Sequence, residues 1–170
     1  MARRIEHRTR SRWDVRTVYT TLVDPAYLDA RLAALGGRGA GLADHRVGPG
    51  EEVRYRLRHG VESRHLPPAV RTLLGGDLMI DRTETWRPDP AGGYAGTVTV
   101  TIPGMPGDLG GKVRLSDDGN GGTTQVMDGS VQIPIPLVGG RIEETVADQI
   151  KSLLDAEHTF TEEWLDKHHR

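Results

Sequence analysis

The stretch VGGRIEETVADQIKSLLDAEHTFTEEWL, residues 138–165, decides the fold of this chain. Its apolar side chains recur three or four positions apart, which predicts one long helix with an apolar stripe. Charged side chains, from Glu143 and Glu144 to Glu162 and Glu163, are expected on the opposite, solvent-facing side. Such a helix extends about 40 Å, so a broad apolar surface must cover it. The stripe consists of Val138, Ile142, Val146, Ile150, Leu153, Leu154, Phe160 and Trp164.

Length and composition indicate one domain over residues 1–170, which is long enough to bury a core without a structural metal ion or disulfide bonds. The chain has no cysteine, which excludes thiolate nucleophiles, disulfides and cysteine metal ligands, and is compatible with a cytoplasmic protein. A net charge of −2 gives no electrostatic footprint for nucleic acid. The start, Met1-Ala-Arg-Arg, does not resemble a signal peptide, and no stretch is apolar enough to span a membrane.

The N-terminal third predicts a strand followed by two helices. Residues 4–12 alternate between arginine-rich and other positions, which is typical of a half-exposed strand. A helix is expected from the N-cap Asp14 to Asp24, and a second from Pro25 to Gly36. The glycine-rich segment 36–41 lacks the third glycine of a nucleotide-binding fingerprint, since Leu42 occupies that position, and it is interpreted as a turn.

Short alternating segments then predict six strands in hairpin succession, with a short helix between Leu66 and Gly76. Without recurring helical crossovers the sheet should be antiparallel. We therefore expect an α+β fold in which a curved antiparallel sheet of about seven strands wraps around the long C-terminal helix. The strands are expected over residues 42–47, 53–61, 77–86, 94–102, 112–115 and 127–135.

Two strands carry polar groups on an apolar face. Arg82 and Glu84 share their face with Ile80, so they should pair with each other, lie at a wet cavity mouth, or meet a polar group of a ligand. His59 lies on the apolar face of its strand, where it is either a hydrogen-bonded core histidine or a ligand or base. The opposite face of that strand, with Arg54, Arg56 and Arg58, is either a solvated surface or an anion grip.

Three segments resemble a known family. They are GDLMIDRTETW at 76–86, IPIPLVGGRIE at 133–143 and FTEEW at 160–164. With the order of elements they resemble the START-like (SRPBCC, helix-grip) superfamily, and most closely the uncharacterised actinobacterial family of domain of unknown function 2505. The resemblance implies a ligand cavity between the sheet and the C-terminal helix. It implies no catalytic residue set.

The leading functional prediction is binding of a small, largely apolar molecule, since a curved sheet cannot contact a straight helix along its whole length. An alternative is an enzyme similar to polyketide aromatase/cyclases, with Glu84 and His59 as weak catalytic candidates beside Arg82 and Tyr94. Another is a protein-interaction module, which would need an exposed apolar patch and no cavity. No metal or cofactor is expected, and His168-His169 is interpreted as a polar tail. The expected lining residues are Tyr55, Leu57, His59, Ile80, Arg82, Glu84, Trp86, Tyr94, Val98, Met127, Val131, Ile150 and Leu154.

Overall fold

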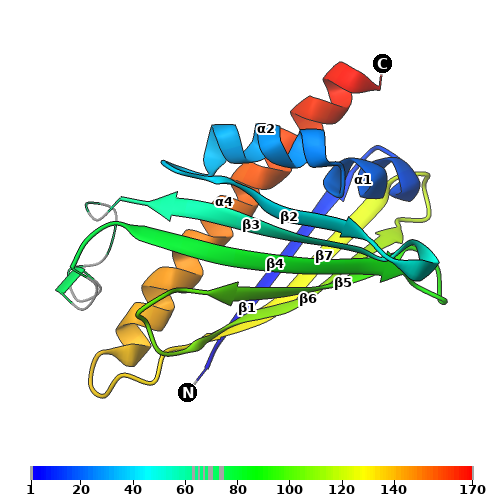
Figure 1. Cartoon of the computed structure of the whole chain (residues 1–170). Coiled ribbons are helices and arrows are strands. Elements are labelled where there is room, and N and C mark those ends of the chain that lie inside the picture. Colours follow the sequence, from blue (N-terminus) through cyan, green and yellow to red (C-terminus); the bar gives the residue numbers. More distant parts are fainter. Residues whose placement is uncertain are drawn as a thin grey trace.

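The computed structural model describes residues 2–62, 64, 66, 68, 71–72 and 75–169, and its elements follow the predicted order (Figure 1). Much of the predicted short helix between Leu66 and Gly76 lies outside the described residues. The described elements are β1 (Arg3–Ser11), α1 (Val15–Leu22), α2 (Pro25–Leu35), β2 (Gly41–Val47), the 3-10 turn η1 (Pro49–Glu51), β3 (Val53–Val61), β4 (Leu78–Pro88), β5 (Tyr94–Thr101), β6 (Asp108–Asp117), β7 (Thr123–Gln132) and α4 (Gly139–His168).

Both short helices begin where an aspartate caps them. The Asp14 carboxylate accepts a hydrogen bond from the Thr17 backbone nitrogen at 2.9 Å, and the Asp24 carboxylate accepts one from Ala26 at 3.1 Å. These bonds satisfy backbone donors that the first turn of a helix leaves free. The predicted starts of α1 and α2 are therefore confirmed.

The glycine-rich segment after α2 is a tight connection between helix and sheet. The Gly60 nitrogen on β3 donates a hydrogen bond to the Gly36 carbonyl oxygen at 2.7 Å. A Cβ atom on Gly60 would lie 1.9 Å from the Arg38 carbonyl oxygen, so only glycine allows this approach. The connection anchors the end of α2 beside the C-terminal end of β3.

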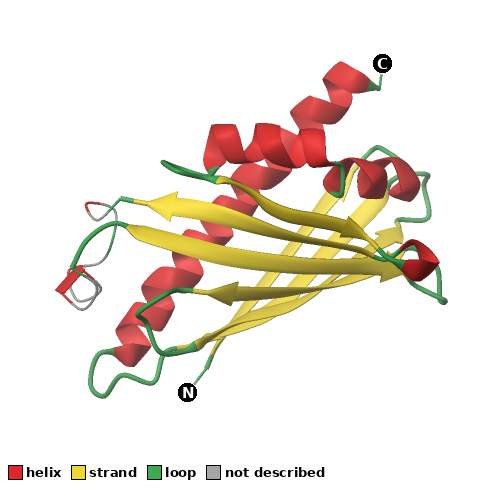
Figure 2. Ribbon diagram, in the orientation of Figure 1, coloured by secondary structure: helices red, strands yellow, loops and turns green. Residues whose placement is uncertain are grey.

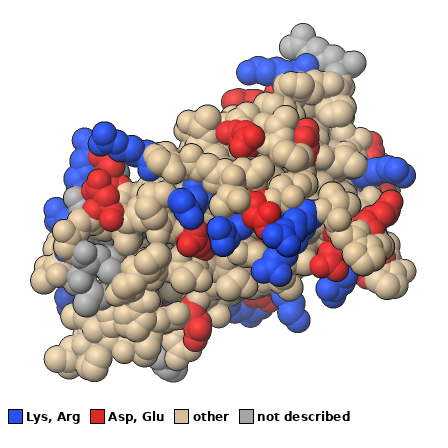
Figure 3. All heavy atoms as spheres, viewed as in Figure 1, with Lys and Arg blue, Asp and Glu red and all other residues tan. Residues whose placement is uncertain are grey.

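The seven strands form one antiparallel sheet in the order β1-β7-β6-β5-β4-β3-β2. The sheet curves, and α4 packs along its concave side next to β1 (Figure 2). This arrangement confirms the predicted fold class. The convex side faces solvent, and Figure 3 shows Lys and Arg side chains there interspersed with Asp and Glu.

The strands β6 and β7 differ from their predicted bounds. β6 starts at Asp108 rather than at Lys112, and β7 ends at Gln132 rather than at Ile135. Gly110 and Gly111 interrupt the alternation of β6, so the sequence pattern shows only its second half. The sheet requires glycine there, because a Cβ atom on Gly111 would lie 2.4 Å from the Asp128 carbonyl oxygen of β7.

The long helix α4 starts at Gly139 and has 30 residues, and two predictions about its faces are wrong. Val138 precedes the helix and is 36% exposed, so it lies outside the buried stripe. Glu143 is buried rather than solvent-facing, and its carboxylate accepts a hydrogen bond from the Ile133 backbone nitrogen at 2.7 Å. The carboxylate thereby satisfies a buried amide where the chain turns from the sheet into the helix.

The interior has two ends. At the packed end, α1 and α2 cover the sheet beside the C-terminal half of α4 (Figure 1), and Tyr27, Leu57, Trp86, Leu115 and Leu165 are at most 1% exposed. At the hollow end, a smaller cluster includes Ile5, Leu78, Val131, Ile133 and Ile142. There the N-terminal half of α4 faces the concave side, and Leu66 packs in the same cluster.

Candidate ligand-binding cavity

A cavity of about 330 Å³ lies between the N-terminal half of α4 and the concave side of the sheet. This volume is at the lower end of the range typical of small-molecule sites. Nearly all of its wall is aliphatic. The lining residues are Ile5, Leu35, Gly36, His59, Gly60, Val61, Leu66, Leu78, Ile80, Arg82, Val98, Val100, Ile102, Met105, Leu109, Gly110, Met127, Gly129, Ser130, Val146, Gln149, Ile150, Leu153 and Leu154.

Strand register brings the lining residues together. His59 on β3 pairs with Ile80 on β4, while Arg82 pairs with Val100 on β5. Side chains paired across an antiparallel sheet point to the same face, so these groups all face α4. The predicted lining residues that do line the cavity are His59, Ile80, Arg82, Val98, Met127, Ile150 and Leu154.

Other predicted lining residues lie elsewhere. Tyr55, Leu57 and Trp86 are fully buried at the packed end, and Tyr94 stacks on Tyr19 of α1 with ring centroids 3.6 Å apart. Val131 is buried in the cluster beside the cavity. All five share the inward face that the alternation predicts, but the four aromatic and leucine residues lie where side chains from α1, α2 and α4 fill the space, and Val131 packs against its own cluster.

Glu84 is also held away from the cavity. Its Oε1 atom accepts hydrogen bonds from the Tyr55 hydroxyl at 2.9 Å and from the Trp86 indole nitrogen at 3.2 Å. Burial beside this carboxylate raises the pKa of Tyr55 well above its usual value, so the phenol stays protonated as a donor. Glu84 is therefore a fixed acceptor inside the packed end.

A buried charged network, formed by Arg31, Arg82, Glu84 and Glu157, separates the two ends. The Arg82 Nη1 atom donates to both oxygens of Glu157, at 3.1 and 2.9 Å, and Arg31 Nε lies 3.6 Å from Glu157. Arg82 Nε lies 2.9 Å from Glu84 Oε2, an ion pair whose geometry is not aligned for a hydrogen bond. Arg82 and Glu84 thus pair with each other as one predicted alternative stated, and Arg82 also lines the cavity.

Within the network, Arg82 and Glu157 are both ionised. Burial by itself would raise the pKa of Glu157, but Arg31 and Arg82 outweigh it and lower this pKa to about 2. Burial by itself would lower the pKa of the Arg82 guanidinium, but Glu157 and Glu84 raise it above its ordinary value. Such a set is held together by mutual compensation, so removing one member leaves an uncompensated buried charge.

His59 is the uncharged polar group of the cavity wall. The residue is 7% exposed, and its Nε2 atom is buried without a hydrogen-bond partner among the described residues. Burial, together with the nearby Arg82 charge, lowers the pKa of His59 to about 4. The imidazole is therefore neutral at physiological pH, with an open hydrogen-bonding atom.

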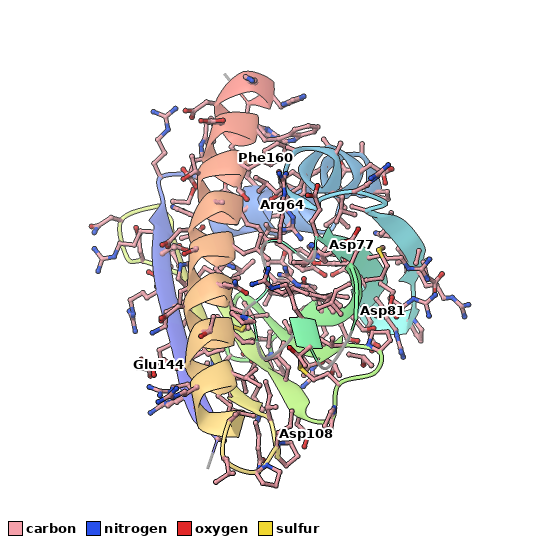
Figure 4. The ribbon with its side chains drawn as sticks, turned by 90° about the vertical axis from the view of Figure 1, so that its left-hand side faces the viewer. Arg64, Asp77, Asp81, Asp108, Glu144 and Phe160 are labelled. Carbon is pink, nitrogen blue, oxygen red and sulfur yellow. The ribbon has the colours of Figure 1, made fainter. Side chains whose placement is uncertain are left out.

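Several cavity residues were absent from the predicted set. Val146 and Leu153 belong to the apolar stripe of α4, and Val100 shares the parity of Val98, so the sequence carried a signal for them. Leu35 carries no such signal, because its place depends on how α2 packs against β2 and α4. Figure 4 shows the molecule from the hollow end. In this view Asp77, Asp81 and Asp108 lie on the side of the strands, and Glu144 lies on α4.

Two further classes of site find no support among the described residues. None of the His, Asp and Glu side chains within the ranges given above cluster in threes as a metal site would require. Over the same ranges, no helix combines the length and apolar character needed to cross a bilayer. Location in the cytoplasm stays a prediction.

The curved sheet and the long C-terminal helix form a helix-grip fold of the START-like type. The chain belongs to the family described as protein of unknown function (DUF2505), whose model matches residues 6–165. An uncharacterised protein of Mycobacterium tuberculosis is 31% identical over 156 residues, which cover 89% of this chain and 90% of the relative. These matches confirm the resemblance that the sequence motifs indicated.

Solved structures share the fold at low sequence identity. The Zhui aromatase/cyclase from a Streptomyces species superposes with a TM-score of 0.66 at 14% identity, covering 100% of this chain and 97% of the other. A norcoclaurine synthase point mutant from Thalictrum, in complex with a transition-state analogue, gives a TM-score of 0.59 at 11% identity, covering 100% and 98%. At these identities the likeness establishes the fold alone.

Proposed function

We propose that this protein binds a small, largely apolar molecule, of lipid, sterol or polyketide type, in the cavity between the sheet and α4. The observation that carries the proposal is a mostly aliphatic hollow of about 330 Å³ between the sheet and α4, with few polar side chains on its wall. Water gains few hydrogen bonds in such a space, so an apolar solute of matching size replaces it favourably.

Titration with 1,6-diphenyl-1,3,5-hexatriene tests the proposal, because this hydrocarbon has no polar atom and fluoresces when it leaves water. The variant Ile150→Trp places an indole in the cavity and should weaken binding by about tenfold or more, about 1.4 kcal/mol. Ser152→Trp, on the exposed side of the same helix, is the matched control and should bind the probe as the wild type does. Equal binding by both variants would reject the cavity as the site.

The geometry supports binding better than catalysis of the aromatase/cyclase type. Of the candidate catalytic groups, His59 and Arg82 line the cavity, whereas Glu84 and Tyr94 do not. Arg82 is already engaged by two carboxylates. A proton transfer would therefore depend on His59 alone, whose lowered pKa makes it a weak base.

The interaction-module alternative required an exposed apolar patch without a cavity. The large apolar side chains exposed among the described residues are Val47, Met79, Leu137 and Val138, which come from separate elements or a loop. Since the described part of the chain also contains the cavity, the condition for this alternative is not met.

A further inference from the structure

We infer that the ligand of this cavity is electrically neutral and carries an alcohol or ketone oxygen that hydrogen-bonds to His59 Nε2 beside Arg82. The inference rests on the proposed function and narrows it to a class of ligand. It separates neutral oxygenated apolar molecules from fatty acids and from apolar amines.

His59 offers the cavity a polar atom that is unpartnered in the described part of the chain. His59 Nε2 is buried on the cavity wall without a hydrogen bond among the described residues. A buried polar atom without a partner is unfavourable, by an amount comparable to a lost hydrogen bond. A ligand oxygen that reaches Nε2 removes this penalty. Neutral imidazole can donate or accept at Nε2 according to its tautomer, so both an alcohol and a ketone fit.

The charged network beside the cavity already has equal numbers of cations and anions. In the charged network the two guanidinium groups of Arg31 and Arg82 face the two carboxylates of Glu84 and Glu157. The set is balanced without a ligand. A ligand carboxylate would add a third buried anion opposite two cations, and a ligand ammonium would add a third cation, so either would be buried without compensation.

His59 and Arg82 lie close enough together to face one polar group of a ligand. His59 and Arg82 lie on neighbouring strands, and the direct partner of Arg82 on β3 is Leu57, two residues from His59. Diagonal neighbours of this kind are within reach of one small polar group. The other polar side chains on the wall are Ser130 and Gln149. The remaining wall is aliphatic and suits the hydrocarbon body of the ligand.

The inference is tested with decan-1-ol, decan-2-one and decanoate, three probes that share one chain length. Each competes with diphenylhexatriene at pH 7.5, where decanoate is ionised and His59 is neutral. We expect the alcohol and the ketone to displace the hydrocarbon at concentrations at least tenfold below that needed for decanoate. Displacement by decanoate at the same concentration as by decan-1-ol would overturn the inference and leave the proposed function standing.

Substitution of His59 supplies the second readout. His59→Leu should weaken decan-1-ol by about three- to tenfold relative to diphenylhexatriene, because the alcohol loses one hydrogen bond and the hydrocarbon makes none. His59→Gln keeps a hydrogen-bonding group and should retain most of the affinity for decan-1-ol. If His59→Leu folds poorly, His59→Gln still tests the role of His59. Unchanged alcohol affinity in both variants would overturn the assignment to His59. Failure of the wild type to bind diphenylhexatriene or any of the three probes would overturn the proposed function as well.

Discussion

The packed end and the hollow end of the interior are built from the same sheet and the same helix, yet only one is solid. At the packed end α1 and α2 insert Tyr19, Tyr27 and Leu28 between the sheet and α4. At the hollow end the N-terminal half of α4 faces the concave side, Leu35 of α2 and Leu66 reach the cavity wall, and aliphatic side chains leave a space of about 330 Å³. Helix side chains and the large strand residues Tyr55 and Trp86 fill the packed end, whereas the strand residues at the hollow end are mostly aliphatic or glycine and leave the cavity open.

The charged network marks the boundary between the ends, and breaking it should have the largest effect. Glu157→Gln leaves the guanidinium groups of Arg31 and Arg82 buried with less negative charge, so we expect a loss of about 3–5 kcal/mol in the free energy of unfolding. Urea denaturation followed by circular dichroism measures this loss. The exposed Glu163→Gln on the same helix should change stability by less than about 0.5 kcal/mol. Similar values for both variants would show that the network does not hold the two ends together.

Leucine truncation on α4 compares the two ends with one residue type. Leu165 is fully buried at the packed end, so Leu165→Ala should cost about 3–5 kcal/mol. Leu153 borders the cavity and is only partly buried, so Leu153→Ala should cost about 1 kcal/mol. Chemical denaturation of both variants checks the difference. An equal loss would mean that the hollow end is packed as tightly as the other.

The hollow end should also make stability depend on pH through His59. Folding lowers the pKa of this residue from 6.5 to about 4, so between these values the unfolded chain binds more protons than the folded one. Stability should therefore fall as the pH falls from about 6.5 to about 4, by at most about 3 kcal/mol. Denaturation at a series of pH values should give a flatter dependence for His59→Leu than for the wild type. Parallel curves would contradict the lowered pKa.

A smaller effect should come from the hydrogen bond between Tyr27 and Thr161, which joins α2 to α4 at the packed end. Thr161→Val leaves the buried Tyr27 hydroxyl without this partner and should cost about 1–2 kcal/mol. Thr161 also donates to the Glu157 carbonyl oxygen, and Thr159→Val is the matched control because it removes an exposed hydroxyl that donates in the same way to the Asp155 carbonyl oxygen. It should cost less than about 0.5 kcal/mol. Thermal unfolding of the two variants separates the contributions.

The fold was predictable because its signals are local. Asp14 and Asp24 mark the helix starts, and alternation in β3 gives its bounds from Val53 to Val61 as observed. β6 was recognised only in part, because Gly110 and Gly111 have no side chain to show the pattern.

The site was predictable only in part. Alternation shows which face of the sheet a residue is on, but not whether that part of the strand lies at the packed end or at the hollow end. Leu57 and His59 share one face, but one packs in the solid core and the other lines the cavity. The network partners Arg31 and Glu157 were missed as well. Glu157 follows Leu154 by three residues and precedes Thr161 by four, so helical spacing carried a signal that its charge obscured.

Xenon-pressurised crystals offer the most direct test, since xenon enters empty apolar cavities and gives anomalous scattering. We predict xenon between Ile80, Val98, Met127 and Leu154 at the hollow end, displaced when decan-1-ol is soaked in, and none beside Leu57 or Leu165. A hollow end without xenon, or with xenon that decan-1-ol does not displace, would contradict the account.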